Sequence, residues 1–514
     1  MSFIRPSCRV WPALLPGLLF VPMILAPPVN HDVAAVLSFS ERWLAGERLY
    51  IDMVDVNPPL IYVLNLLPAV LGRVSGLGGI LALQACLVAL CLMLWRLTLS
   101  VRDRTGEGPV ERVLLDALPG LIGFGAGYDF GQREALMVML SMPYLLAAAQ
   151  RMDGRVPRRA LLAASVAAIG FALKPHFLAV PALVEGAVLV GGLYRHQGSA
   201  VLRDKVPWVM AALWCGYLVG MLLVFPEYLT NVVPLALAYY LDSGHQTTWD
   251  LLAQPRLGAA VILFVPLVVL ALCQAAALPR VLALAGLATL GAALAQHKGW
   301  SYHILPVEFF GCTLATVLAA RWLDRLQVGA TPFGAVGCAA WLASLFGLYL
   351  VAQGEAPWNQ LGWRRSDAYA LTSILRPEAG GGRVLALSPG IAPVFPALNY
   401  ANVRMTLRAM SIWLLEGLYR DCSPGHARYR DFGDMSGAEV AFYVGVIADF
   451  THAPPDAVVI DSFAAIPACD GIAFNLIDYF NRDPSFAATW AHYVEVGRHG
   501  RFAVFARRPQ SPPR

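Results

Sequence analysis

Charged residues are scarce in this chain of 514 residues. Asp, Glu, Lys and Arg together make up 14% of it, whereas apolar residues make up 58%. A soluble domain of this size needs a larger charged surface, so the composition indicates an integral membrane protein. The formal net charge of +4 is small and spread over the loops, and it indicates no nucleic-acid partner.

Cysteine motifs are also lacking. The nine cysteines include no C-x-x-C pair, which leaves no Cys-based zinc or thioredoxin-like motif. Seven of them lie in or beside apolar segments, where cysteine usually serves as a small apolar residue. Only Cys422 and Cys469 fall in the polar C-terminal third. We predict that they form a disulfide, because we expect that region in an oxidising compartment.

Eleven apolar runs are predicted to span a membrane. The first follows Arg5 and Arg9 and has no A-x-A site after it, so we expect an uncleaved span rather than a signal peptide. The runs lie at about 11–29, 79–97, 113–128, 135–150, 160–174, 177–194, 207–225, 257–276, 281–296, 304–320 and 332–352.

A twelfth segment, "PPLIYVLNLLPAVLG" at 58–72, decides the orientation of everything after it. It has 15 residues and three prolines, which is short for a crossing. If it does not cross, sixteen Lys and Arg residues of the span-connecting loops lie on the N-terminal side and seven on the other. Because basic residues of short loops face the cytoplasm, we predict that 58–72 lies along the outer face, with the N-terminus cytoplasmic.

This topology predicts a membrane domain at 1–352, with a first outer loop at 30–78, and an outer domain at 353–514. The C-terminal region has the pattern of a small α/β domain. "RVLALS" and "DAVVID" are short β-branched runs, "HYVEVGRHGRFAVFAR" is a hairpin candidate, and "IAFNLIDYF" has helical spacing. The region contains neither a GxGxxG nor a Walker motif. The predicted fold class is therefore an all-α polytopic membrane domain with a C-terminal soluble α/β domain.

The stretch "NHDVAAVLSFSERWLAGERLYIDMVDVNPPL" at 30–60 places acidic residues directly after the first apolar run. Together with the Arg-rich inner loops and the outer tail, it resembles the GT-C class of polytopic glycosyltransferases. That class includes dolichyl-phosphate-mannose protein mannosyltransferases and lipid A aminoarabinose transferases. "HD" with "ERWLAGERLY" is similar to the first-loop acidic motif and amphipathic helix of the class, and "NPPL" to its Lys-Pro-Pro-Leu element.

The resemblance implies an inverting transfer of a sugar from a polyprenyl-phosphate carrier to an envelope glycan, lipid or protein on the outer face of a bacterial-type inner membrane. Asp32 matches the first-loop catalytic carboxylate, and Asp129 matches the position of a second-loop acidic residue. Asn57 stands where relatives often have Lys, so a contact to the carrier phosphate is either lost or supplied by another cation.

The chemistry of such a transfer needs a base for the acceptor's proton and cations for the departing phosphate. Asp32 is the candidate base, although Asn30 or Asp32 is equally suited to cap a helix. Arg133, Lys174 and Lys298 are the candidate phosphate ligands. Their structural alternatives are a salt bridge to Glu134 for the arginine and an interfacial position for the lysines.

Further candidates for acceptor or substrate binding are Asp52, Asp55, Asn57, Tyr240, His245 and His303. Ordinary turn chemistry is the alternative for the two aspartates, and a polar loop for Tyr240 and His245. No cofactor is firmly indicated. A divalent metal remains open, held either by the aspartates or by the histidines of "HKGWSYH".

Two other classes of function compete with the transferase. A transporter or flippase of lipid-linked sugars should have ionisable residues in mid-span and internal repeats, and the sequence shows neither clearly. A non-catalytic envelope assembly factor would leave the polar outer loops without a shared role.

Overall fold

The computed structural model describes residues 10–194, 202–240, 246–421 and 428–508, which divide into two compact units. The first unit comprises the described residues of Met1–Pro27, Gln84–Met221 and Gly244–Gln360. The second comprises those of Pro28–Leu83, Leu222–Ser243 and Leu361–Arg514. The two units differ from a single boundary at 352/353, because the first predicted outer loop packs with the C-terminal region.

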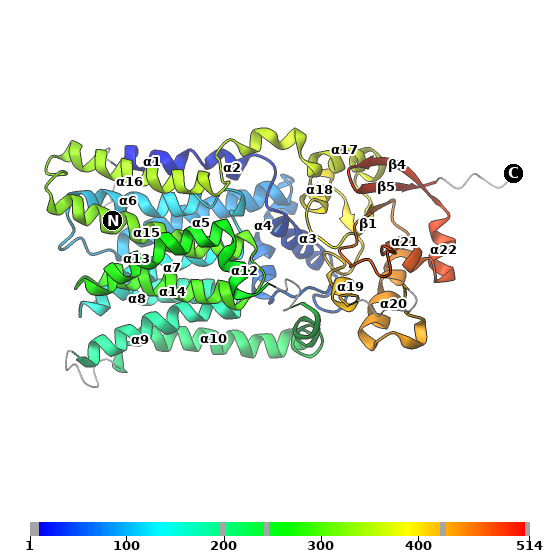
Figure 1. Ribbon diagram of the computed structural model, residues 1–514, viewed down its shortest axis with the longest axis horizontal. Helices are drawn as coiled ribbons and strands as arrows, with labels where there is room; N and C mark the ends of the chain where they lie inside the picture. Colours follow the sequence, from blue (N-terminus) through cyan, green and yellow to red (C-terminus); the bar gives the residue numbers. More distant parts are fainter. Residues whose placement is uncertain (1–9, 195–201, 241–245, 422–427, 509–514) are drawn as a thin grey trace. The chain divides into compact units, whose positions relative to one another are not determined.

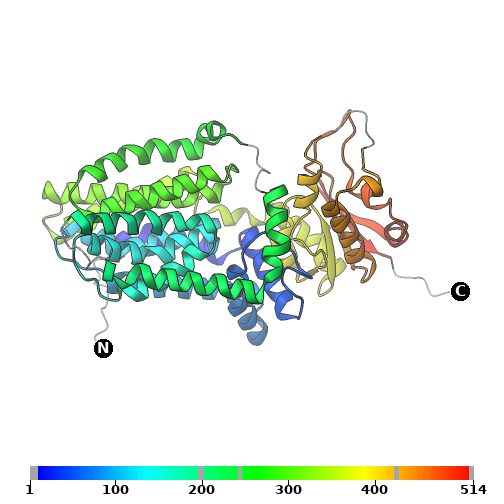
Figure 2. The same cartoon turned by 90° about the horizontal axis from the view of Figure 1, so that it is seen from below.

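The first unit is helical, and its long helices lie roughly parallel in both views (Figure 1, Figure 2). Its elements are α1 (Trp11–Leu18), α2 (Val21–Leu25), α5 (Gly79–Val101), α6 (Pro109–Phe124), η1 (Gly127–Asp129), α7 (Arg133–Met152), α8 (Ala160–Ala172), η2 (Pro175–Leu178), α9 (Ala179–Tyr194), α10 (Lys205–Val224), α12 (Thr248–Ala253), α13 (Pro255–Cys273), α14 (Ala277–Ala295), α15 (Ser301–Arg325) and α16 (Pro332–Ala352).

Among the described residues, eight helices are long and apolar enough to cross a membrane. Within the unit, α7 and α15 are central, since 94% and 83% of the most apolar 18-residue stretch of each helix is buried. The corresponding value for α10 is 17%, which leaves most of its apolar surface facing outward. These helices confirm the prediction of a polytopic membrane domain.

Three predicted spans form shorter helices. The run at 11–29 is divided into α1 and α2, because Pro22 has no N–H to continue the first helix. The run at 113–128 continues beyond α6, which has 16 residues and ends at Phe124, and the run at 160–174 continues beyond α8, which has 13 and ends at Ala172. Prolines and short apolar runs limit the length of these three helices, and the count of eleven spans stays a prediction.

The second unit combines helices with one sheet. Its helices are α3 (His31–Leu44), α4 (Leu60–Ser75), η4 (Tyr228–Val232), α11 (Val233–Leu235), η5 (Ala236–Tyr240), η6 (Asn359–Arg365), α17 (Asp367–Ala379), α18 (Val394–Ala401), α19 (Trp413–Leu418), η7 (Phe432–Asp434), α20 (Gly437–Thr451), α21 (Leu476–Phe480) and α22 (Pro484–Trp490). Its strands are β1 (Arg383–Leu387), β2 (Arg404–Met405), β3 (Ala457–Asp461), β4 (Tyr493–His499) and β5 (Phe502–Arg507).

The sheet has the strand order β2-β1-β3-β5-β4. Strands β2, β1 and β3 are parallel, and β3, β5 and β4 are antiparallel. This confirms the predicted α/β domain, both β-branched runs and the C-terminal hairpin. The helix expected over 472–480 is confined to α21, because Ile472 instead pairs with Cys469 in a β-bridge.

Cys469 is disulfide-bonded, as predicted. Its predicted partner, Cys422, lies outside the described residues, so the pairing itself stays a prediction. The remaining cysteines of the described residues are free.

Helix α3 and the loop after it pack on the C-terminal part of the second unit. The buried Arg42 guanidinium donates to the Glu47 carboxylate at 2.6 and 2.8 Å and to the Leu407 carbonyl at 2.8 Å. Glu47 is also paired with Arg404 of β2. Val54 donates its N–H to the Arg408 carbonyl at 2.7 Å. The first predicted outer loop and the α/β domain are therefore one structural unit.

The buried Arg42 should be essential for this packing. We expect Arg42→Ala to lower the free energy of unfolding by about 3 kcal/mol, since breaking a buried ion pair leaves uncompensated polar groups. Arg48→Ala is the matched control, because Arg48 pairs with Asp52 on the surface and should change stability little. Thermal unfolding of the two purified variants in detergent measures both effects, and equal midpoints would contradict the prediction.

Glu47 should make the stability of the second unit sensitive to acid. Burial alone would raise the pKa of Glu47, but hydrogen bonds from Arg42 and Arg404 outweigh burial and lower it. A carboxyl whose pKa is lower in the folded state stabilises that state at any pH above its pKa in the unfolded chain. This stabilisation is lost as the pH falls through its pKa in the folded protein. We therefore expect the stability difference between wild type and Glu47→Gln to shrink below about pH 4.5. If the difference in stability between wild type and Glu47→Gln stayed constant from pH 7 to pH 3, the prediction would be wrong.

Candidate active site

Asp32 lies in the first turn of α3. The Asn30 side chain caps the helix and accepts hydrogen bonds from the N–H groups of Asp32 and Val33 at 2.9 and 3.3 Å. The capping role that the sequence left open thus belongs to Asn30. The Asp32 carboxylate is nearly buried and has the His31 imidazole at 3.7 Å. A carboxylate beside an imidazole, at the positive end of a helix, is suited to hold or pass a proton.

The other polar residues of the first loop take part in a turn. Asp55 is buried and accepts hydrogen bonds from the Asn57 side chain and the Tyr62 hydroxyl, both at 2.6 Å. The Asn57 carbonyl accepts from the Tyr50 hydroxyl at 2.6 Å. Asp52 is ion-paired with Arg48 at 3.0 Å on the surface. These contacts favour the turn role over substrate binding for Asp52, Asp55 and Asn57.

Tyr240, the last residue of η5, packs its ring against Trp413 at a centroid distance of 5.4 Å. This contact makes Tyr240 part of the second unit beside α19. His245 lies outside the described residues, so its predicted role stays a prediction.

The predicted phosphate ligands belong to the first unit. The Lys174 ammonium, between α8 and η2, is 2.5 Å from the Glu134 carboxylate in the first turn of α7. Both side chains are nearly buried. The same ammonium lies 5.1 Å from the centre of the Tyr302 ring. Glu134 therefore holds the Lys174 side chain in place, and an interfacial lysine reaching for lipid headgroups would not be buried in this way.

The segment "HKGWSYH" forms the start of α15 and the loop before it. Lys298 is buried and lies over the Trp300 ring, 4.6 Å from its centre. His303 packs between the rings of Trp300 and Tyr302, at 5.3 and 4.5 Å. The charges of Lys174, Lys298 and Arg133 all act on the His303 ring. Three predicted cations are thus gathered around one histidine.

Asp129 ends η1 and Arg133 begins α7, and both are buried. Asp129 acts electrostatically on Arg256 of α13, which forms a bidentate ion pair with Glu308 of α15 at 2.8 and 3.0 Å. Nearby, burial raises the pKa of Glu355, although the Tyr128 N–H donates to its carboxylate at 3.3 Å. The end of the first unit where η1 precedes α7 therefore holds acidic and basic groups from five segments.

A small pocket lies beside the Glu134 carboxylate and is also lined by His176, His303 and Gln296. One oxygen of Glu134 and one ring nitrogen of each histidine are buried and have no hydrogen-bond partner among the described residues. Such atoms are suited to an ordered water or a ligand hydroxyl. Among the described residues, no group of three His, Cys, Asp or Glu side chains is arranged to hold a metal.

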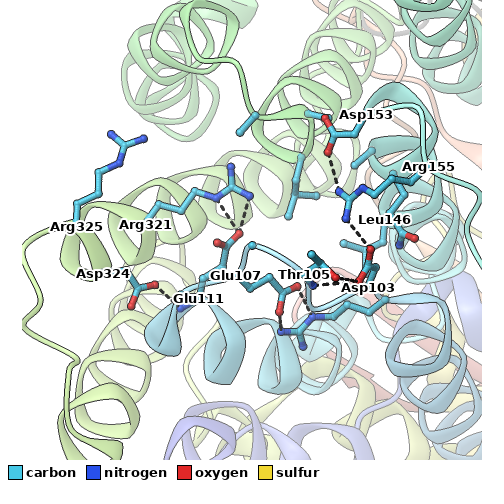
Figure 3. A pocket seen from close by; sticks show the side chains of 18 residues that line it. Asp103, Thr105, Glu107, Glu111, Leu146, Asp153, Arg155, Arg321, Asp324 and Arg325 are labelled. Atoms are coloured by element: carbon cyan, nitrogen blue, oxygen red, sulfur yellow. Dashed lines mark hydrogen bonds and ion pairs between the residues drawn. The ribbon is translucent and has the colours of Figure 1, made fainter.

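A large charged cavity lies at the opposite end of α7 (Figure 3). There Arg321 donates to Glu111 at 2.8 Å, and Arg155 bridges Asp103 and Asp153 at 2.7 Å each. Asp324 accepts the N–H groups of Val110 and Glu111 at the start of α6. These pairs connect the ends of α5, α6, α7 and α15. The ion pairs that line the cavity therefore have a structural role.

The structure thus gathers Arg133, Lys174, Lys298 and His303 in the first unit, and it places Asp129 of the same unit near Arg256. Asp32, Asp52, Asp55, Asn57 and Tyr240 belong to the second unit. The sequence did not single out Glu134 as the partner of Lys174 or Arg256 as the partner of Glu308. An acidic residue near the end of an apolar run was the available signal for both pairs.

No protein-family model matches the chain, and no curated protein sequence matches it. A crystal structure of ArnT from Cupriavidus metallidurans bound to undecaprenyl phosphate is similar in fold. The similarity covers 98% of this chain and 98% of that chain, with a TM-score of 0.52 and 13% sequence identity. It confirms the predicted GT-C-like fold.

Proposed function

We propose that this protein is a membrane glycosyltransferase that takes a sugar from a polyprenyl-phosphate carrier and passes it to an acceptor outside the cytoplasm. The observation that carries the proposal is the set of buried cations, Arg133, Lys174 and Lys298, at one end of an apolar helix bundle, where both lysines lie against aromatic rings that pack on His303. A site for a soluble anion does not need an apolar helix bundle around it. A lipid-linked phosphate does, because its hydrocarbon chain stays in the bilayer while the phosphate reaches the cations. The fold shared with ArnT bound to undecaprenyl phosphate supports the same ligand class.

In this proposal, the cations stabilise the phosphate that leaves the sugar. Lys174 is held by Glu134 before the donor arrives, so little reorganisation is needed when the phosphate binds. Asp32 removes the proton from the acceptor hydroxyl as it attacks the anomeric carbon, and Asp129 is the second carboxylate. Attack opposite to the leaving phosphate inverts the configuration at that carbon.

The packing of the first loop supports the proposed topology. Arg42 and Glu47 contact Leu407 and Arg404, so the loop and the C-terminal domain lie on one side of the membrane. This requires an even number of crossings between residues 57 and 361. Ten predicted spans supply it if α4 does not cross. The disulfide at Cys469 is typical of an oxidising compartment, which supports an extracytoplasmic domain at a bacterial-type inner membrane.

Surface cysteines should report this topology directly. We expect Ile51→Cys and Val74→Cys, on either side of α4, to react with a membrane-impermeant maleimide in intact cells, and Val156→Cys to be protected. All three positions are exposed in the structure. The background would lack the other free cysteines. Reaction at only one of residues 51 and 74 would mean that α4 crosses the membrane.

A transporter or flippase of the same lipid-linked sugar is the alternative function. It would place ionisable groups in mid-span. Arg256 is the second residue of α13, and its partner Glu308 lies within the first third of α15, so this pair stands toward the helix ends. The arrangement therefore favours a site near one membrane face.

Carrier binding tests the proposal at its first step. We expect the purified protein to bind undecaprenyl phosphate much more tightly than undecaprenol, which has the same chain without the phosphate. Native mass spectrometry with both lipids in one detergent solution measures the preference. Equal binding of the two lipids would show that only the hydrocarbon chain is recognised and would remove the basis of the proposal.

A further inference from the structure

The sheet of the second unit has a topological switch point between β1 and β3. From β1, the chain crosses through α18 to β2 on one side, and it then crosses through α19 and α20 to β3 on the other. The two connections run in opposite directions across the sheet, so the switch point lies at the carboxyl ends of β1 and β3. In open α/β sheets, ligands bind at the carboxyl ends of the strands beside a switch point, as in folds with the strand order 2-1-3.

Polar side chains end both strands at the switch point. Ser388 follows β1, and its hydroxyl lies 3.3 Å from a carboxylate oxygen of Asp461, the last residue of β3. The Asp461 side chain is fully buried and also accepts the Phe463 N–H at 3.0 Å. In the loop after β3, Ala465 has a φ of +57°, a conformation that non-glycine residues rarely adopt. Such conformations concentrate at functional sites.

Arg501, in the turn between β4 and β5, is fixed at the same edge. Its Nε lies 3.0 Å from the other Asp461 oxygen, and its guanidinium stands over the rings of Phe463 and Phe502 at 5.3 and 5.2 Å. The Arg501 side chain is nevertheless 45% exposed, and Phe463 is 55% exposed. The turn thus presents an oriented set of hydrogen-bond donors next to an accessible aromatic ring.

We propose that this edge, formed by Ser388, Asp461, Phe463 and Arg501, binds a neutral sugar ring. The Arg501–Asp461 pair has no net charge, which favours hydroxyl groups over an anion. The Phe463 ring offers a face for the C–H groups of the sugar, and the Arg501 Nη atoms offer donors to its hydroxyls. The site would hold a saccharide of the acceptor, an assignment that rests on the proposed glycosyltransferase function.

Direct binding to the full-length protein tests the site without the transfer reaction. The probes are maltotriose, cellotriose, chitotriose and mannotriose, observed by saturation-transfer difference NMR in detergent without a lipid donor. We expect at least one to bind, and both Phe463→Ala and Arg501→Gln to weaken it by about tenfold or more. Phe463→Tyr, which keeps the aromatic face, should restore binding.

Matched controls come from the same domain. Phe432→Ala removes a ring that is 58% exposed on η7, and Arg498→Gln removes an arginine of β4 that is 52% exposed. Both should leave binding unchanged. Binding of no probe, equal loss in the controls, or displacement of the sugar by millimolar inorganic phosphate would overturn the proposal. Failure here with intact undecaprenyl phosphate binding would refute the sugar site alone, whereas the reverse would refute the carrier site.

Discussion

Replacement of Asp32 by Asn is expected to lower the rate of sugar transfer by about 10²- to 10⁴-fold, the usual contribution of a general base. The substitution keeps the volume of the side chain and removes its charge. Because Asn30 provides the cap of α3, the helix start should be unaffected. Transfer measured with a lipid-linked sugar donor reports the loss, and the thermal midpoint reports the fold.

Two comparisons make the Asp32 result specific. Asp478→Asn, a change of the same kind at an exposed position, should retain full transfer. Undecaprenyl phosphate should still bind to Asp32→Asn, since the base is needed after the donor is in place. Full turnover by Asp32→Asn would eliminate Asp32 as the base, even if every other part of the site proved correct.

Replacement of Lys174 by Met should have the second large effect. The lost ammonium is expected to weaken undecaprenyl phosphate binding by about tenfold to a hundredfold, the value of a charge-assisted hydrogen bond or ion pair. The variant should also lose about 3 kcal/mol of stability, because the buried Glu134 side chain loses its ion-pair partner. Lipid titration and thermal unfolding measure the two effects.

A double variant separates the two roles of Lys174. Lys174→Met with Glu134→Gln removes both charges and should recover much of the stability without recovering lipid binding. Lys205→Met, at an exposed position, should change neither quantity. If the double variant bound the lipid as wild type does, Lys174 would be a structural residue only.

Local patterns in the sequence predicted most of the elements. The β-branched runs of "RVLALS" and "DAVVID" gave β1 and β3, and the alternation of 492–507 gave the hairpin of β4 and β5. The first apolar run was predicted as one span and is two short helices. Its prolines were visible, but where a helix restarts after a proline depends on the packing of its neighbours.

The site was predictable in part. The charge pattern and the resemblance predicted roles for Asp32, Lys174 and Lys298. All three side chains are buried or nearly so. The pairs that organise the site join residues 40 and 52 positions apart, Glu134 with Lys174 and Arg256 with Glu308. Local patterns cannot assign such partners, because the fold alone brings them together.

Asp55 shows the opposite case. A role in binding a metal or the acceptor was open to it from its place before two prolines. Its carboxylate accepts three hydrogen bonds, from Tyr62 and from the main chain and side chain of Asn57. Turn chemistry was the simpler interpretation, and the structure favours it.

Release of free undecaprenyl phosphate is the measurement that tests the central claim most directly. The protein would be reconstituted in liposomes with undecaprenyl-phosphate-linked hexoses and pentoses and with an envelope extract as the acceptor source, and the free carrier would be followed by mass spectrometry. Sugar transfer predicts release from at least one donor by wild type and none above background by Asp32→Asn. Movement of the intact donor between leaflets without release would instead identify a flippase and contradict the transferase.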